Sequence, residues 1–111
     1  MFNAASGESY KSALPGILLK TLVFGEKTLL SEFRLTAGAQ LPAHSHIHEQ
    51  TGYLVSGKIR LTIGGDSFVA GPGDSWCIPG NVEHRAEILE DSVAIEVFSP
   101  VRDDYLPSEK S

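Results

Sequence analysis

The amino-acid sequence predicts an all-β protein, built as a sandwich or barrel of short strands. Between Gly38 and Pro100, glycine and proline recur often, at intervals of ten residues or fewer as far as Gly80, which is typical of such folds. No stretch keeps apolar residues at helical spacing for long enough to predict an α-helix. The runs between the interruptions alternate polar and apolar residues or are apolar throughout, as strands do.

Eight of these runs have the length and composition of strands. In chain order they are residues 16–24, 28–36, 50–56, 58–64, 66–71, 74–79, 84–89 and 92–100. The Gly-Gly pair within residues 63–66 is typical of a two-residue hairpin, whose turn needs positive φ angles. Residues 25–27 and 55–58 resemble hairpin turns as well. We therefore expect the chain to reverse at all three places.

The size and charge of the chain restrict its organisation and its partners. A length of 111 residues suits one domain, residues 1–111, in which a barrel core of about residues 17–99 lies between polar arms. The net charge is −5 and the basic residues are scattered singly, which argues against nucleic-acid binding. The N-terminal region has no basic segment, and its first apolar run is too short for a signal peptide or a membrane span. We therefore expect no membrane partner and a cytoplasmic location.

Three of the four histidines lie in residues 44–50, "HSHIHEQ". If this segment is a strand, His44 and His46 point to the same face, because successive side chains alternate. Imidazole is the commonest metal ligand among side chains, and a third ligand is available in His84. This histidine follows a turn, "IPGNVEH", that can bring a distant strand beside the first. The cluster predicts a metal site, and the alternative is an exposed polar strand face.

Two longer motifs surround these histidines. Residues 38–57 contain a glycine, five residues, His-x-His, three residues, Gln50, six residues and a glycine. Residues 73–84 contain a glycine, five residues, a proline and, after a short turn, a histidine. Together they resemble the two motifs of the cupin superfamily, and most of the chain is similar to a small single-domain cupin. The resemblance implies a jelly-roll barrel, also called a double-stranded β-helix.

The sequence departs from the cupin pattern at three positions. Gln50 stands where a glutamate is usual, Asn81 where a glycine is usual, and Ile88 where an asparagine is usual. The resemblance implies one divalent transition metal per chain, which would be Zn, Ni, Mn, Fe or Co. The implied ligands are His44, His46, Gln50 and His84.

An amide at position 50 changes the chemistry expected of such a site. Because the amide is neutral, three imidazoles and Gln50 leave the full divalent charge on the metal, which makes it a stronger Lewis acid. The alternative is that Gln50 is an ordinary polar strand residue. His48 shares strand parity with His46, so it could be a ligand, a neighbour of the site or a solvated residue. Glu49 has the opposite parity and is expected to face outward or to orient a neighbour.

Two charged residues near the C-terminus are the candidate catalytic groups. Glu96 is the only ionisable residue in the apolar run 92–100, and alternation places it on one face with Ala94 and Phe98. If that face lines the barrel, Glu96 is suited to proton transfer; otherwise it is an outward edge residue. Arg102 can pair with the carboxylate of an anionic substrate, and its alternative is an exposed arginine in the tail.

The C-terminal stretch narrows the resemblance. An amide in the fourth ligand position, an acid two residues before Phe98 and "SPVRDDYL" are together similar to the cupins of pectin and alginate degradation. Those enzymes convert unsaturated monomeric uronates to linear keto forms. The resemblance implies that Glu96 acts on the substrate, that Phe98 forms a pocket wall, and that Arg102 binds the substrate carboxylate.

Two other functions stay open at this point. One is a metal-dependent dioxygenase that acts on a small organic substrate, and the other is a non-catalytic cupin that binds a small molecule. For all three functions we expect a small-molecule ligand, and for the uronate enzyme an anionic one. We also expect a homodimer, because pairing protects the exposed edges of a small sheet.

Several other residues carry expectations of their own. Cys77 is the only cysteine, so no intramolecular disulfide can form, and its apolar surroundings predict a buried thiol. Phe33 and Trp76 are interpreted as core or wall residues. Arg60 and Tyr53 have the parity of residues that could face the cavity.

Overall fold

The computed structural model describes residues 1–107. These residues form eight strands and one short 3-10 helix, and they contain no α-helix. The elements are β1 (Lys11–Leu14), β2 (Ile17–Phe24), β3 (Leu29–Leu35), β4 (Gln40–His44), β5 (Glu49–Ile63), β6 (Asp66–Ala70), β7 (Ser75–Ile78), β8 (His84–Ser99) and η1 (Asp103–Tyr105). The prediction of an all-β protein is therefore confirmed. Among the described helices, none has the length and apolar composition to cross a membrane.

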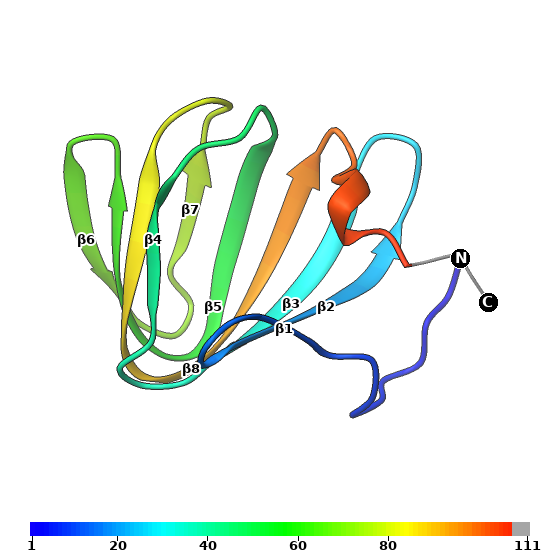
Figure 1. Ribbon diagram of the computed structural model, residues 1–111, viewed down its shortest axis with the longest axis horizontal. Coiled ribbons are helices and arrows are strands. Elements are labelled where there is room, and N and C mark those ends of the chain that lie inside the picture. Colours follow the sequence, from blue (N-terminus) through cyan, green and yellow to red (C-terminus); the bar gives the residue numbers. More distant parts are fainter. Residues whose placement is uncertain (108–111) are drawn as a thin grey trace.

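All strand pairs are antiparallel, and two long strands organise the sheet. The main strand order is β1-β2-β3-β8-β5-β6, while β4 pairs with β8 and β7 pairs with β5. Strand β8 thus pairs with β5 along most of its length, and on its other side with β4 and then β3. Each long strand has two shorter partners along one of its edges: β4 and β3 along β8, and β6 and β7 along β5. The sheet curls into a barrel, with β1 to β3 toward one end and β4, β6 and β7 toward the other (Figure 1).

Two of the three expected hairpins are present. Phe24 pairs with Leu29 around one turn, and Ile63 pairs with Asp66 around the Gly-Gly turn. The expected reversal at residues 55–58 is wrong, because β5 continues through it as one strand with several bulges. Gly57 has a φ of 96° there. A side chain at Gly57 would overlap with Ser92 on β8, so this glycine permits a close strand approach at a bulge.

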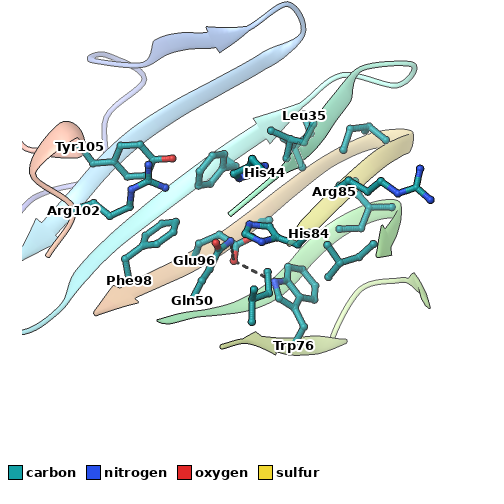
Figure 2. A pocket seen from close by; sticks show the side chains of 18 residues that line it. Leu35, His44, Gln50, Trp76, His84, Arg85, Glu96, Phe98, Arg102 and Tyr105 are labelled. Carbon is teal, nitrogen blue, oxygen red and sulfur yellow. Dashed lines mark hydrogen bonds between the residues drawn. The ribbon is translucent and has the colours of Figure 1, made fainter. Parts of the chain in front are cut away.

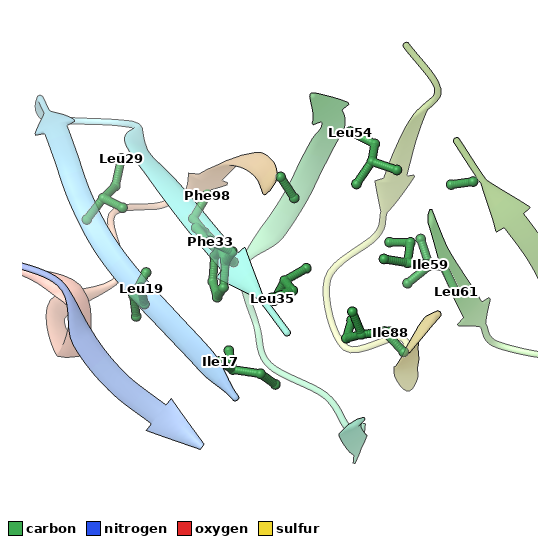
Figure 3. Close-up of a cluster of buried hydrophobic side chains, with 13 residues drawn as sticks. Ile17, Leu19, Leu29, Phe33, Leu35, Leu54, Ile59, Leu61, Ile88 and Phe98 are labelled. Atoms are coloured by element: carbon green, nitrogen blue, oxygen red, sulfur yellow. The ribbon is translucent and has the colours of Figure 1, made fainter. Parts of the chain in front are cut away.

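The interior is built from the inward faces of the strands (Figure 3). Alternation along β8 is regular: Ala94, Glu96 and Phe98 are buried, and the residues between them are only partly covered. Burial of one large apolar side chain contributes about 1.5–3 kcal/mol. The buried apolar cluster consists of Ile17, Leu19, Leu29, Phe33, Leu35, Leu54, Ile59, Leu61, Ala70, Ala86, Ile88, Ala94 and Phe98.

The buried thiol expected at position 77 is wrong. Cys77 is exposed, because Trp76 and Ile78 take the inward positions of β7 and leave the intervening residue outside. Arg60 and Tyr53 are also outside: Arg60 forms an ion pair with Glu87 on the surface, and Tyr53 is 50% exposed. Plain alternation with the buried Gln50 and Leu54 already places Tyr53 outside, whereas the bulges between Leu54 and Ile59 shift the alternation and turn Arg60 outward.

Candidate metal centre and the cavity around it

Three histidines converge where β4 ends and β8 begins. His44 is the last residue of β4 and pairs with His84, the first residue of β8. The ring centroid of His84 lies 4.3 Å from that of His44 and 4.9 Å from that of His46. One ring nitrogen from each of the three lies within 4.8 Å of the others. This cluster can hold a metal ion, as the sequence predicts.

The reason expected for the convergence of His44 and His46 is wrong. Strand β4 ends at His44, and His46 lies in the connection to β5, so the two histidines do not share a strand face. The connection is held in place by the turn before β8. The backbone N–H of Asn81 donates to the carbonyl of His46 at 2.7 Å. Asn81 has a φ of 67°, a conformation that asparagine tolerates better than most residues with a side chain.

The second ring nitrogen of each histidine fixes its tautomer. The Nδ1 atoms of His44, His46 and His84 lie 2.8, 3.0 and 2.9 Å from backbone carbonyl oxygens. Because a carbonyl only accepts, each Nδ1 carries the proton, and each Nε2 has a free lone pair. Histidine ligands of metals are oriented in this way.

Two further observations fit a metal held on the Nε2 side. The Nε2 atom of His84 is buried and has no hydrogen-bond partner among the described residues, and buried polar atoms are rarely left so. Burial lowers the pKa of His84. The pKa of His46 is lowered mainly by burial and next by the positive charge of the nearby Arg102 guanidinium. Both shifts favour the neutral imidazole that binds metals.

Gln50 lies beside the three histidines, buried near the start of β5. Its Oε1 is 3.1 Å from His46 Nε2, while its Nε2 donates to Glu96 Oε1 at 3.0 Å. In the tautomer assigned above, Oε1 and the histidine Nε2 are both acceptors, so they cannot bond to each other. Neighbouring ligands at about 2.1 Å from one ion lie about 3 Å apart in octahedral geometry. The arrangement is therefore compatible with Gln50 as fourth ligand, which stays a prediction.

The neighbours of Gln50 in the connection play other parts. The carbonyl of His48 accepts the Nδ1 proton of His46, and the His48 ring is outside the group that can hold the metal. Glu49 is exposed at the start of β5. Of the three roles expected for His48, the structure shows a neighbour of the site, which contacts a candidate ligand through its backbone carbonyl.

Glu96 faces the cavity beside this cluster (Figure 2). Its side chain is 8% exposed and lies on the inward face of β8, as alternation predicts. Burial raises the pKa of Glu96 to about 7, against the hydrogen bonds from Gln50 and Trp76, which lower it. A buried carboxyl group of this kind can carry a proton to or from a bound molecule. The catalytic role of Glu96 stays a prediction.

Arg102 follows β8 and also lines the cavity, near His46 and His84. Its guanidinium carbon is 5.1 Å from the ring centroid of Phe98 and 4.0 Å from that of Tyr105. Its Nε and Nη2 donate to the two carboxylate oxygens of Asp104 at 3.2 and 2.7 Å. The position suits the expected contact with an anionic substrate, and the structure adds Asp104 as a partner that already occupies one edge of the guanidinium.

The cavity is lined mainly by apolar and aromatic side chains, with a few polar groups among them. Trp76 lines the cavity, which confirms its interpretation as a core or wall residue. Sequence reasoning missed the inward position of Tyr105, and nothing in the sequence indicated the hydrogen bond from the indole N–H of Trp76 to Glu96. The lining residues are Phe33, Leu35, Leu41, His44, Gln50, Ile59, Leu61, Trp76, Ile78, His84, Arg85, Ala86, Ile88, Ala94, Glu96, Phe98, Arg102 and Tyr105.

An antiparallel barrel with a cluster of three histidines is the structure that the resemblance to cupins implies. The sequence profile of the cupin domain matches residues 31–99. The chain belongs to the cupin family. It is 31% identical over 93 residues to the pectin degradation protein KdgF of Dickeya dadantii, covering 82% of this chain and 84% of that protein.

Two further comparisons place the chain within the family. The structure of KdgF from Halomonas sp. superposes with a TM-score of 0.90 and 31% sequence identity, covering 96% of this chain and 98% of that one. The oxalate decarboxylase OxdC of Bacillus subtilis is 31% identical over 100 residues, covering 86% of this chain. The chain spans only 25% of the length of that enzyme.

Proposed function

We propose that this protein is a metal-dependent isomerase that opens the ring of an unsaturated uronate monomer and converts it to the linear keto form. One observation carries the proposal. The lining of one cavity combines a buried carboxyl group, Glu96, histidines of the cluster that can hold a metal, and a cationic side chain, Arg102. The similarity to two KdgF proteins, one of them named for pectin degradation, supports the same substrate class.

The reaction needs a proton transfer and no oxidant. The anomeric hydroxyl of the cyclic substrate loses its proton as the bond between the anomeric carbon and the ring oxygen breaks. The electrons of that bond remain on the ring oxygen, which becomes an enol or enolate. A proton then adds to the alkene carbon that does not carry this oxygen, so that the enol becomes a ketone, while the anomeric carbon has become an aldehyde. Substrate and product are isomers, so atoms and electrons balance.

The residues of the cavity would divide the work as follows. Glu96 takes the proton from the hydroxyl and returns it to the alkene carbon, as a general base and then a general acid. Arg102 binds the substrate carboxylate through the edge of its guanidinium that Asp104 leaves free. A divalent ion held by His44, His46, His84 and Gln50 would supply Lewis acidity toward a sugar oxygen.

The experiment is a turnover assay with unsaturated uronate monomers prepared from pectin and from alginate. The ultraviolet absorbance of the conjugated double bond is followed with zinc-loaded protein, with metal-free protein and with the Glu96→Gln variant, and NMR identifies the product. The proposal expects faster loss of absorbance than in buffer alone, and only with the metal-loaded wild type. A rate equal to the spontaneous one for both monomers would exclude this function.

Three alternatives are tested with the same protein preparation. A dioxygenase would consume oxygen with a small organic substrate, and the similarity to OxdC makes release of carbon dioxide from oxalate worth measuring. A binding protein would retain a uronate in equilibrium dialysis without converting it. The proposed isomerase consumes no oxygen and releases no carbon dioxide.

A further inference from the structure

A row of three residues crosses three neighbouring strands along the cavity wall. Trp76 on β7 pairs with Gly52 on β5, and Gly52 pairs with Glu96 on β8. The indole N–H of Trp76 donates to Glu96 Oε1 at 3.2 Å. The two side chains therefore bond to each other (Figure 2) across the strand that contains the glycine.

The glycine is required here by space. A Cβ at position 52 would overlap with the indole Nε1 of Trp76 and with Glu96 Oε1, the two atoms that form the hydrogen bond. Gly52 does not have the positive φ that would itself favour glycine. A glycine inside a strand weakens the strand. Here the absence of a side chain leaves the space in which the indole N–H of Trp76 reaches the carboxyl group of Glu96.

Both hydrogen bonds of the Glu96 side chain end on the same oxygen. Gln50 Nε2 donates to Oε1 at 3.0 Å, and the indole donates to Oε1 as well. No hydrogen bond from the described residues reaches Oε2. Two donors from different directions fix the orientation of the carboxyl group, whereas the single bond from Gln50 would leave it free to rotate.

We propose that Trp76 is a positioning residue: together with Gln50 it holds Oε1 of Glu96, so that Oε2 is the oxygen that exchanges a proton with the substrate. Gly52 is part of the same arrangement, because it provides the space for the hydrogen bond between Trp76 and Glu96. The inference rests on the proposed function, in which Glu96 is the group that moves the proton. It assigns Trp76 no contact with reacting atoms.

The first test separates proton transfer from binding. Trp76→Phe keeps an aromatic wall but removes the donor, and Gly52→Ala keeps both partners but obstructs their bond. A positioned acid–base group contributes about 10²–10⁴-fold, so we expect each variant to lower kcat by about tenfold or more while KM changes less than about twofold. Gly25→Ala is the matched control, because it adds a methyl group where no atom lies within 4 Å.

The second test needs no turnover. Trp76 is the only tryptophan in the chain, so the ¹⁵N-labelled, zinc-loaded protein gives one indole N–H resonance. We expect this resonance to move upfield, and its exchange with water to become faster, in Glu96→Leu and in Gly52→Ala. In Gly25→Ala it should stay at the wild-type position.

The two tests distinguish failure of the positioning role of Trp76 from failure of the proposed function. An indole resonance unchanged in Glu96→Leu would overturn the inference, whatever the activity. An unchanged kcat in both Trp76→Phe and Gly52→Ala would also overturn it, provided that wild type is active. If wild type converts no uronate while the indole resonance responds, the hydrogen bond stands, but the proposed function and the role of Oε2 in it fall together.

Discussion

His44 and His84 are paired across strands β4 and β8, with ring centroids 4.3 Å apart. Each Nδ1 is bonded to a carbonyl two residues earlier in its own chain segment, Pro42 for His44 and Val82 for His84. Strand pairing and these backbone contacts thus place two candidate ligands and set their tautomers in the same structure. A site built this way is oriented by the fold itself, which lowers the entropy lost when an ion binds.

Metal binding should therefore stabilise the folded protein. At a free zinc concentration about 100 times the dissociation constant, we expect the free energy of unfolding to rise by about 2.7 kcal/mol. The gain should be absent in His84→Ala and retained in His48→Ala, because the His48 ring is outside the cluster. Urea unfolding with and without zinc measures both. Equal stabilisation of His84→Ala and wild type would mean that zinc binds elsewhere.

Replacement of Gln50 should separate metal affinity from turnover. In Gln50→Glu, a negatively charged carboxylate should bind a divalent ion more tightly than the neutral amide does. The same change replaces the donor that now lies 3.0 Å from Glu96 with a second carboxyl group, and like charges at that distance raise one of the two pKa values strongly. We expect turnover to fall despite the tighter metal. Isothermal titration and the uronate assay measure the two effects, and full activity in Gln50→Glu would argue against this arrangement.

Binding of the substrate carboxylate should depend on the guanidinium group of Arg102. Arg102→Lys keeps the charge but loses the planar fork and the stacking on Phe98 and Tyr105. We expect KM to rise by about tenfold, with a smaller effect on kcat, because the interaction exists before and during the reaction. Arg34→Lys, on the outer surface, is the control. A KM that does not change in Arg102→Lys would remove Arg102 from the binding site.

The stability of the protein should also depend on Glu32 at acid pH. Burial alone would raise the pKa of Glu32, but hydrogen bonds from Arg34 and Tyr10 outweigh it, and the pKa lies below its ordinary value. Since the folded pKa is lower than the unfolded one, the contribution is present above the unfolded pKa of 4.5 and is lost as pH falls through the folded pKa.

Glu32→Gln should accordingly lower the free energy of unfolding by about 1 kcal/mol near neutral pH. The difference from wild type should shrink as pH falls below the ordinary pKa of glutamate. Urea titrations at several pH values measure it. A difference that is constant down to the acid end of the series would show that the charge of Glu32 does not contribute.

Much of the fold followed from local patterns. Turn residues indicated the hairpins at residues 25–27 and 63–66, and alternation in β8 indicated that Glu96 faces inward with Phe98. Gly57 was misread because a glycine with positive φ serves a bulge as well as a turn. Which of the two forms depends on the partner strand, and the local sequence does not contain that information.

The candidate site was predictable in its residue types and less so in its geometry. The spacing of the motifs indicated His44, His46 and His84, but the place of His46 depends on a contact to the turn at Asn81. The bond from Trp76 to Glu96 depends on the register of three strands at once. Such contacts join residues far apart in the chain, so no local pattern predicts them.

The central claim is that the histidine cluster holds a metal, and elemental analysis of the purified protein tests it most directly. Wild type should be compared with His46→Ala, His84→Ala and the control His48→Ala. We predict about one divalent transition-metal ion per chain in wild type and control, and less than about a tenth of that in the other two. Metal retained at the wild-type level in both His46→Ala and His84→Ala, or absent from wild type supplied with zinc, nickel and manganese, would contradict the claim.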